Sequence, residues 1–483
     1  MRFSHAALGA AWLLSGSVTA HPADIYSVFT NPSNNWDAHT TIEFPNSTAF
    51  ENATERWNTF DEPTFSIAIT PGTDADVAKA VKLARSNNFP FLGTGGRHSS
   101  SVTLGALQNG VAIDLSGLNS VSVDSAAATV TVGGGVRFGA VVDPVYEAGF
   151  EVPIGSYAYP GMVGATIGGG VGRWQGLHGL IIDNLLSVRM VTADGNLITV
   201  SNTSYPDLWW AVRGAAANFG LITSATYLRP LINGGQLMNA HFILPASANA
   251  SYFDYLASLQ GTMPAELATI TFIMWNDTIG ESQILINWVW IGPEEEGQKY
   301  IAPLYNLNPT EVSVEMVAWN KITNTAAFGL GVPICEPVHI KGYGANFRNL
   351  SSTTYQDVFR DMSDFYAAYP DGRGSSVEIE IFAPQAVAQV ADDATAYPWR
   401  DSLGISFGWN STATEQAGDA MAMQVRAAFA ATGGYSGLAT YVSYAHGDET
   451  LEQMWGGNVP RLQQLKEKYD PDNVFRFFHD LAQ

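Results

Sequence analysis

The amino-acid sequence predicts an α+β fold built from two parts that differ in their secondary-structure pattern. In the first part, a strand, a helix and a second strand follow one another within residues 64 to 92. After about residue 232 the strands become longer and helical stretches separate them, which is typical of an antiparallel sheet backed by helices. A chain of 483 residues buries a large core and divides into two or more domains or subdomains.

The first part begins with a strand at 65 to 69, where apolar and polar residues alternate. Thr73 and Asp76 then form the start of a capped helix, and a strand is expected to return at 89 to 92. Shorter strands separated by Gly, Asn and Ser turns follow. They lie at 111 to 115, 121 to 124 and 128 to 132, and in a hairpin over 186 to 200 that folds at Asp194-Gly195.

The second part is expected to contain long strands at 268 to 275 and 283 to 291, with helices near 250 to 260, 353 to 368 and 413 to 431. Aromatic residues are dense in this part. They belong to the core by default, although one face of such a sheet could line a pocket, and periodicity leaves both interpretations open. The residues concerned are Trp275, Trp288, Trp290, Phe382, Trp399, Phe407 and Trp409.

Composition and charge exclude several classes of protein. With 23 Lys and Arg against 45 Asp and Glu, the net charge is −22, which argues against nucleic-acid and anionic-membrane partners because phosphate binding needs clustered cations.

Cys335 is the only cysteine, so no internal disulfide is expected and we assign it no role. The sequence has no Cys/His cluster, so no metal site is expected. The string 404 to 408 matches a G-x-S-x-G nucleophile elbow but lies in a strand-like run, so we interpret it as chance.

The N-terminus has the pattern of a cleaved secretion signal over residues 1 to 20, with an apolar stretch from Ala6 to Leu14 that is shorter than the roughly 20 residues needed to span a bilayer. The mature chain is expected to begin near His21 and to be secreted as an acidic monomer. Seven Asn-x-Ser/Thr triplets beside this signal predict a glycoprotein. They lie at Asn46, Asn52, Asn202, Asn249, Asn276, Asn349 and Asn410.

Two glycine-rich segments are the candidates for ligand binding. The string Gly93-Thr94-Gly95-Gly96-Arg97-His98-Ser99-Ser100-Ser101 follows a predicted strand, and successive glycines can present several N–H groups to a pyrophosphate. It matches neither G-x-x-x-x-G-K-[ST] nor G-x-G-x-x-G, so a Rossmann fold loses its main support. A second glycine-rich stretch over 155 to 172 would let a large flat ligand lie against the backbone. Taken alone, either segment is as consistent with ordinary turns.

The order of these segments, with Tyr469-Asp470-Pro471-Asp472-Asn473-Val474-Phe475 near the C-terminus, resembles the berberine bridge enzyme-like oxidases. These form a branch of the vanillyl-alcohol-oxidase-type FAD superfamily that is common in fungi. The resemblance covers roughly residues 60 to 230 and 435 to 480. It implies a PCMH-type FAD-binding domain of two subdomains over 21 to 232, with its core at about 60 to 232. A substrate-binding domain over 233 to 434 would interrupt it, and residues 435 to 483 would complete it.

In that family the His of the first glycine loop is joined covalently to the flavin 8α carbon, and the matching residue here is His98. Many members add a second bond through a Cys. That place falls near Tyr157 here, so we expect FAD with a single covalent link and no cysteinyl link. The other residues that the resemblance places at the cofactor are Thr94, Gly95, Gly96, Arg97, Ser99, Gly155, Tyr157, Gly161, Met162, Gly164, Thr166, Gly169, His178, Ile182 and Asn473.

A small residue of the second glycine loop is thought to admit O2 in the family, and the matching position here is Met162. A methionine could yield space for O2, or it could close the path and leave a dehydrogenase that uses another acceptor. A doubly linked flavin usually accompanies an open site for bulky substrates in this family. The expected single link therefore makes oligosaccharide oxidation a weaker expectation.

The resemblance points to two segments for the acid/base step. Tyr441-Val442-Ser443-Tyr444 resembles the family string Tyr-x-Asn-Tyr, and a tyrosinate base would need its pKa lowered by charge from Arg97 or His178. Glu378 and Glu380 share one face of a predicted strand. We expect that face to be solvated or hydrogen-bonded by default, with Val377, Ile379 and Ile381 as the packed face. The candidate catalytic residues are Tyr444, Tyr441, Glu380 and Glu378.

The sequence therefore predicts an FAD-dependent oxidoreductase, and an oxidase that releases hydrogen peroxide in preference to a dehydrogenase. Its substrate would be a small organic molecule, a secondary metabolite or, second in preference, a sugar. One alternative is a flavin-bound cyclase with little or no net redox chemistry. Another is a secreted binding protein on a degenerate oxidase scaffold, suggested by Tyr157, Met162 and Ser443 in place of the family residues.

Overall fold

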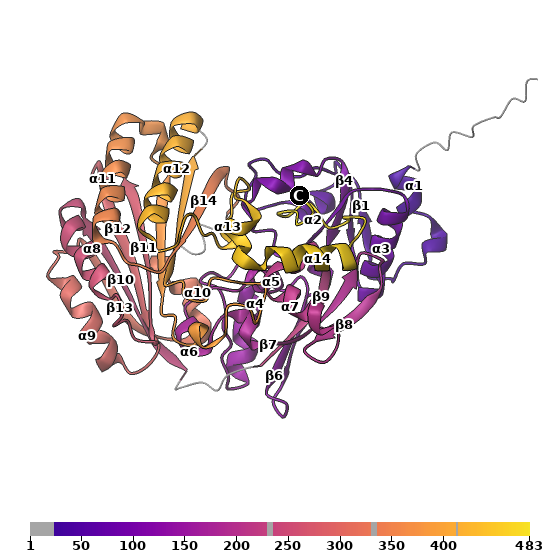
Figure 1. Cartoon of the computed structure of the whole chain (residues 1–483), viewed down its shortest axis with the longest axis horizontal. Helices are drawn as coiled ribbons and strands as arrows, with labels where there is room; N and C mark the ends of the chain where they lie inside the picture. Colours follow the sequence, from indigo (N-terminus) through magenta and orange to yellow (C-terminus); the bar gives the residue numbers. More distant parts are fainter. Residues whose placement is uncertain (1–23, 229–234, 330–335, 412–413) are drawn as a thin grey trace, which may run out of the picture.

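The computed structural model describes residues 24–228, 235–329, 336–411 and 414–483. The predicted signal segment and Cys335 lie outside the described residues. Within them the fold is α+β, as predicted, with three sheets (Figure 1). Two sheets belong to the N-terminal half and the third to the region after residue 235.

A four-stranded sheet in the order β1-β2-β4-β3 opens the N-terminal half. The predicted strand, capped helix and strand are confirmed: the Thr73 side chain accepts from the Asp76 N–H, and the helix then buries Val77, Ala80 and Val81. Strands β2 and β3 both pair with β4 in parallel. The elements are α1 (Ile25–Phe29), β1 (Thr41–Glu43), α2 (Thr48–Thr54), β2 (Phe65–Thr70), α3 (Asp74–Ser86), β3 (Phe91–Thr94) and β4 (Gly110–Asp114).

A five-stranded antiparallel sheet follows in the order β5-β6-β9-β7-β8. The predicted hairpin is confirmed as β7 and β8, and Gly195 takes a φ of 69° in its turn, which an L side chain rarely adopts. The strands are β5 (Val121–Asp124), β6 (Thr129–Gly133), β7 (Leu185–Thr192), β8 (Leu197–Ser201) and β9 (Gly220–Leu228). The helices are α4 (Phe138–Glu147), α5 (Met162–Gly168), α6 (Gln175–His178) and α7 (Pro206–Ala215).

The third sheet has seven antiparallel strands in the order β13-β10-β12-β11-β15-β16-β14. Helices α8, α9, α11 and α12 cover its outer face, and the other face turns toward the N-terminal half (Figure 1). The strands are β10 (Gln236–Pro245), β11 (Leu267–Asn276), β12 (Glu281–Trp290), β13 (Glu311–Ala318), β14 (Ile340–Phe347), β15 (Ser376–Phe382) and β16 (Gly404–Ser411). The helices are α8 (Asn249–Ser258), α9 (Glu294–Tyr305), α10 (Ile322–Thr325), α11 (Ser352–Ala368) and α12 (Glu415–Thr432).

Strand β15 packs on both faces. Val377, Ile379 and Ile381 lie in the core beneath the outer helices, as predicted, so Glu378 and Glu380 point toward the N-terminal half. The G-x-S-x-G string forms part of β16 and makes no strand-to-helix elbow, which confirms its interpretation as chance. Trp288 and Trp290 belong to the same outer core, whereas Phe407 faces a cavity on the inner side.

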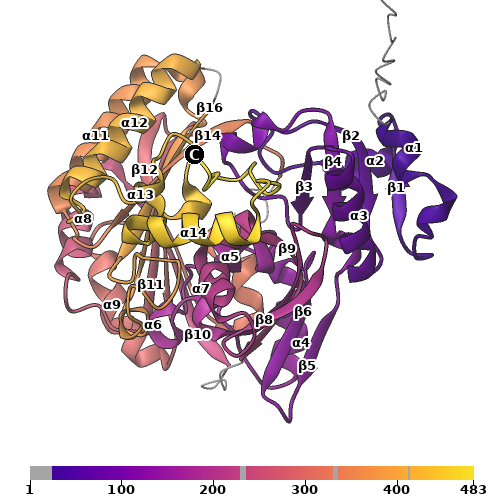
Figure 2. The ribbon, with the colours of Figure 1, turned by 45° about the vertical axis from the view of Figure 1, so that its right-hand side comes forward.

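The last segment returns to the N-terminal half. Helices α13 (Leu451–Trp455) and α14 (Val459–Tyr469) follow the seven-stranded sheet in sequence, and α14 lies beside α7 (Figure 2). The buried Lys466 Nζ donates to the Asp470 carboxylate at 2.7 Å and to the Phe475 carbonyl at 2.7 Å, and it reaches the Asn218 carbonyl at 3.0 Å. This network fixes the chain end to the loop before β9.

Candidate functional site

A cavity of about 350 Å³ lies where the three parts of the chain meet. The glycine loop after β3 forms one wall, and the second glycine loop with the start of α5 forms another. The inner face of the seven-stranded sheet and the C-terminal segment close it. The lining includes residues 93–100, 155–157, 160, 161, 163–165, 217, 218, 475–478, Glu378, Glu380, Phe407 and 441–444.

The two glycine loops pack backbone against backbone. A Cβ on Gly96 would lie 2.1 Å from the Gly161 nitrogen, and a Cβ on Gly95 would lie 2.7 Å from the Gly134 carbonyl oxygen. Larger residues would therefore force the loops apart. Gly164 is different, because a Cβ there meets no atom within 4 Å although the residue lines the cavity. Its bare backbone leaves room for a flat ligand.

These residues fit the FAD that the family resemblance implies. The side chains of Thr94 and His98 each bury a polar atom, Oγ1 and Nε2, that has no protein partner, and buried polar atoms normally have one. Burial, helped by the charges of Arg137 and Arg56, lowers the pKa of His98 to about 4, so its imidazole is neutral near pH 7. The glycine loops would hold the dinucleotide, and His98 would lie beside it as a neutral nitrogen base.

Two tyrosine–glutamate pairs lie at the sheet end of the cavity. The Tyr157 hydroxyl donates to Glu378 Oε1 at 3.0 Å, and the Tyr444 hydroxyl donates to Glu380 Oε2 at 3.1 Å. The two glutamates are only 4% and 3% exposed, so the solvated alternative is wrong and the hydrogen-bonded alternative is confirmed. The strand alternates as predicted, but the N-terminal half covers the second face, which periodicity within β15 could not indicate.

Burial sets the ionisation of this cluster. It raises the pKa of Glu380 to about 7, and the hydrogen bond from Tyr444 opposes that rise. Burial and the charge of Glu380 raise the pKa of Glu378 well above its usual range. Of the two carboxyls, Glu378 is therefore the one whose acid form burial and its neighbour favour, while Glu380 changes between acid and carboxylate near neutral pH.

The hypothesis of a tyrosinate base is contradicted. Burial and the charge of Glu380 raise the pKa of Tyr444 well above its usual range instead of lowering it. The two expected cations are also engaged elsewhere: Arg97 pairs with Asp114 at 3.0 Å and His178 with Glu151 at 3.0 Å. Tyr444 therefore serves as a hydrogen-bond donor to Glu380.

Tyr441 lines the cavity, but its hydroxyl is committed to the second glycine loop. It accepts from the Gly170 N–H at 3.1 Å and donates to the Ala165 carbonyl at 3.4 Å. Burial raises the pKa of this phenol as well. The hydrogen bonds of the Tyr441 hydroxyl therefore suit it to hold the second glycine loop in place and not to transfer a proton.

Arg173 supports the glutamates and was not expected from the sequence. It is 1% exposed, and its Nη2 donates to Asn287 Oδ1 at 2.7 Å. Its charge lowers the pKa of both glutamates against the effect of burial. The sequence signal that could have found it is its setting: a charged residue between Val171, Gly172 and Trp174 is rarely buried unless it has a partner.

Fourteen predicted site residues line the cavity: Thr94, Gly95, Gly96, Arg97, His98, Ser99, Gly155, Tyr157, Gly161, Gly164, Glu378, Glu380, Tyr441 and Tyr444. The other six lie elsewhere. Thr166 binds the Tyr227 hydroxyl at 2.9 Å, and Asn473 binds Asp480 at 2.8 Å. Gly169 packs against Tyr397, and Ile182 lies in a small core cluster. The remaining two are His178, paired with Glu151, and Met162.

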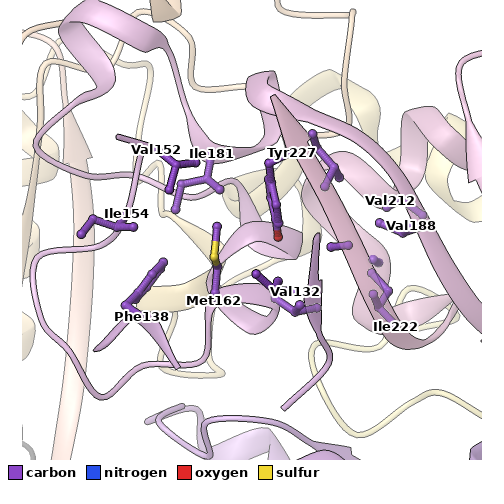
Figure 3. Packing of buried hydrophobic residues seen from close by; sticks show 14 of the residues in the cluster. Val132, Phe138, Val152, Ile154, Met162, Ile181, Val188, Val212, Ile222 and Tyr227 are labelled. Atoms are coloured by element: carbon purple, nitrogen blue, oxygen red, sulfur yellow. The ribbon is translucent and has the colours of Figure 1, made fainter. Parts of the chain in front are cut away.

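Met162 lies in the second glycine loop, as the resemblance suggested, but its side chain does not line the cavity. It is the first residue of α5, and its side chain is fully buried in the core of the N-terminal half. Figure 3 shows it among Phe138, Ile181 and Tyr227, and it is absent from the cavity lining. Its apolar side chain packs inward, so Gly161 and Gly164 supply the cavity surface on either side of it. An effect of Met162 on an oxygen path therefore finds no support in its position.

Several cavity residues were not predicted. Trp57 and Asn218 line it, as do the C-terminal aromatic residues Phe475, Phe477 and Phe478. Ser156, which lies in the second glycine-rich stretch, and Phe407, for which core and pocket were both left open, line it as well. Ser156 also hydrogen-bonds Glu380 and lowers the pKa of that carboxyl. Contacts across domains bring these residues together, so local patterns carry no signal for them.

The comparisons with known proteins identify the family of the chain. Residues 65–201 match the family described as FAD binding domain, and residues 440–480 match the family described as berberine and berberine like. The FAD-linked oxidoreductase OXR1 of Pyricularia oryzae is 45% identical over 92% of this chain and 89% of its own. The FAD-linked oxidoreductase fogF of Aspergillus ruber is 43% identical over 97% of this chain and 96% of its own.

Solved structures share the fold at lower identity. The BBE-like 1 protein of Physcomitrella patens aligns with a TM-score of 0.80 at 22% identity, over 92% of this chain and 97% of its own. A xylooligosaccharide oxidase of Myceliophthora thermophila, solved with xylobiose, aligns with a TM-score of 0.79 at 22% identity, over the same shares of the two chains. With its domains, relatives and fold in agreement, the chain belongs to the berberine bridge enzyme-like family of FAD-linked oxidoreductases.

Proposed function

We propose that this FAD-linked oxidoreductase is an oxidase that removes hydride from a hydroxyl-bearing carbon of a small organic molecule, with Glu380 as the base and O2 as the final acceptor. One observation supports this proposal most directly: Glu380, with a pKa raised to about 7, lines the same cavity as the glycine loops and His98. A base whose pKa lies near the working pH is best suited to proton transfer.

In this proposal, bound FAD supplies the hydride acceptor. The Glu380 carboxylate takes the proton from the substrate hydroxyl, and the hydrogen bond from Tyr444 holds Oε2 in place. Glu378 remains protonated and can donate a hydrogen bond to a second oxygen of the substrate. Apolar and aromatic groups make up most of the lining, and they exclude water, which strengthens these interactions.

We further propose a single covalent link from His98 to FAD and no cysteinyl link. The neutral imidazole in the cavity wall supports the first part. Tyr157 supports the second, because it occupies the place where a Cys would be needed and its hydroxyl is bound to Glu378. Access of O2 is supported by the bare surface at Gly164, because a Cβ there would meet no atom within 4 Å and the Met162 side chain does not line the cavity.

We also propose that the protein is secreted as a glycosylated monomer. Support comes from the signal pattern of residues 1 to 20 and from four acceptor asparagines that are exposed: Asn46, Asn52, Asn202 and Asn349. Asn249 and Asn276 are partly buried, and their amide groups already donate hydrogen bonds within the fold. The side chain of Asn410 lies outside the described part. Within that part, none of the helices is long and apolar enough to cross a membrane.

The covalent link is tested by acid precipitation. Wild-type protein is expected to retain yellow flavin in the pellet, and His98→Ala to release all of its flavin to the supernatant, because alanine has no nitrogen to form the bond. The absorption spectrum of each fraction measures the result. Flavin retained in the His98→Ala pellet would place the link at another residue.

Screening of primary and secondary alcohols with a peroxide assay tests the oxidase chemistry. One hydrogen peroxide per product is expected for an oxidase. Product with much less peroxide would favour the cyclase, and reduced flavin that O2 does not reoxidise would favour a dehydrogenase. A flavin that no substrate or chemical reductant cycles would favour a binding protein.

Replacing Tyr444 by Phe is expected to move the acid limb of the pH–rate profile upward by about one unit. The lost hydrogen bond stabilises the Glu380 carboxylate, and bonds to charged groups contribute about 1.5 kcal/mol, close to the value of one pKa unit. The measurement is kcat/KM against pH. Tyr441→Phe is the control, because its hydroxyl contacts the second glycine loop, and the limb should not move. An unmoved limb in Tyr444→Phe would contradict the assigned contact.

A further inference from the structure

The His98 imidazole is stacked under a tryptophan that no sequence motif marked. The Trp57 and His98 rings lie 4.2 Å apart between centroids and only 9° from parallel, and both residues line the cavity. Parallel stacking covers a face of the imidazole and leaves its edge uncovered by the indole, and the buried Nε2 has no protein partner. A parallel aromatic face restricts the tilt of the imidazole about its side-chain bonds, so Trp57 fixes the plane of the ring.

Backbone pairing on both sides fixes Trp57 in turn. Its N–H donates to the Arg97 carbonyl at 3.1 Å, next to His98 in sequence. Its carbonyl accepts from the Val338 N–H at 2.7 Å, and the Thr59 N–H donates to the Val338 carbonyl at 2.9 Å. Asn58, which is buried, also accepts from the Ile340 N–H through its side chain at 3.2 Å. Trp57 is therefore held between the glycine loop and the segment that leads into β14.

The bond proposed above for His98 requires an oriented, neutral nitrogen. Arg56 donates to the Ser99 carbonyl at 3.2 Å, and its charge helps burial to keep the imidazole unprotonated. Forming the link replaces one imidazole N–H and one C–H of the flavin 8α-methyl group by a C–N bond. The two protons and two electrons that are released pass to O2 as hydrogen peroxide, and correct placement of the ring brings the reacting nitrogen and carbon together.

We infer that Trp57 is a positioning residue for flavin attachment, and that its pairing with Val338 makes the attachment depend on docking of the region after residue 335 onto the glycine loop. This inference rests on the covalent link proposed for His98. It goes beyond that link, because it assigns the orientation of the reacting ring to a residue outside both glycine loops.

The test is the time course of acid-insoluble flavin in purified variants, with total flavin measured in parallel. Trp57→Ala is expected to bind FAD but to attach it about 100-fold more slowly, the order of loss that a misplacement of about 1 Å causes in oriented reactions. Trp57→Phe keeps an aromatic face and should restore most of the rate. Val338→Pro keeps the Trp57 side chain but removes the N–H that holds it, and should also slow the attachment.

Trp36→Ala is the matched control. Trp36 stacks on Phe29 outside the cavity, so its loss should leave attachment at the wild-type rate. Trp57→Ala with wild-type attachment would overturn the role of Trp57 while leaving the His98 link intact. Wild-type protein whose flavin is acid-soluble would overturn the link itself and this inference with it. If Trp57→Ala does not fold, equal attachment rates in Val338→Pro and wild type would overturn the inference.

Discussion

Glu380→Gln is expected to lower kcat by about 10²- to 10⁴-fold, which is the range that a positioned general base contributes. The amide has nearly the same shape and can still accept from Tyr444, but it cannot take a proton. The pH profile gives an independent check. Because burial raises the pKa of Glu380 to about 7, wild-type turnover should rise with pH through about 7 and level off above it. The variant should lack this limb.

Glu378→Gln is the control for that experiment. Burial and the charge of Glu380 raise the pKa of Glu378 and so favour its acid form, and its contact with Tyr157 needs only an acceptor oxygen. Most of the turnover and the acid limb should therefore persist. A Glu380→Gln enzyme that keeps the limb would show that the base is another group, and a severe loss in Glu378→Gln would assign the proton transfer to both carboxyls.

Asp470→Ala is expected to destabilise the protein by about 3–5 kcal/mol, the cost of leaving a buried charge without its partner. Asp470 is 1% exposed and holds the buried Lys466 at 2.7 Å. It also accepts from the backbone N–H groups of Val474 and Phe475 at 2.8 and 2.9 Å. Urea unfolding followed by tryptophan fluorescence measures the loss.

The same substitution should loosen the cofactor, because Phe475 and the residues after it line the cavity. Total bound flavin should fall together with stability. Asp472→Ala is a close control: this carboxylate pairs with Arg85 at the surface, and an exposed ion pair contributes at most about 1 kcal/mol. Equal unfolding curves for the two variants would remove the assigned role of the Lys466–Asp470 pair.

The elements that local chemistry determines could be predicted from the sequence. The helix after Thr73 has its cap and its apolar face within a few residues, and the turn at Asp194-Gly195 needs a positive φ that glycine provides. For such segments, the information that selects the structure lies within the segment. The glycine loops were assigned to the cofactor through the family resemblance, because their composition taken alone is as consistent with ordinary turns.

The surroundings into which the site side chains point could not be predicted in the same way. Alternation placed Glu378 and Glu380 on one face of β15, but only the packed N-terminal half makes that face an interior one. Met162 fits the spacing of a loop residue, yet its apolar side chain is stabilised in the core. Trp57 and Arg173 reach the site through contacts far apart in sequence, and a single sequence carries no record of such contacts.

The cavity wall formed by residues 475–478 has a consequence for the order in which the protein is made. The ribosome completes both glycine loops early and then adds more than half of the chain before this wall exists. A chain that ends before residue 475 would carry every glycine of the loops and still have an open site. Since N-terminal segments fold first during synthesis, the early subdomains are expected to form before this wall, and the cavity is closed only once the last residues have been added.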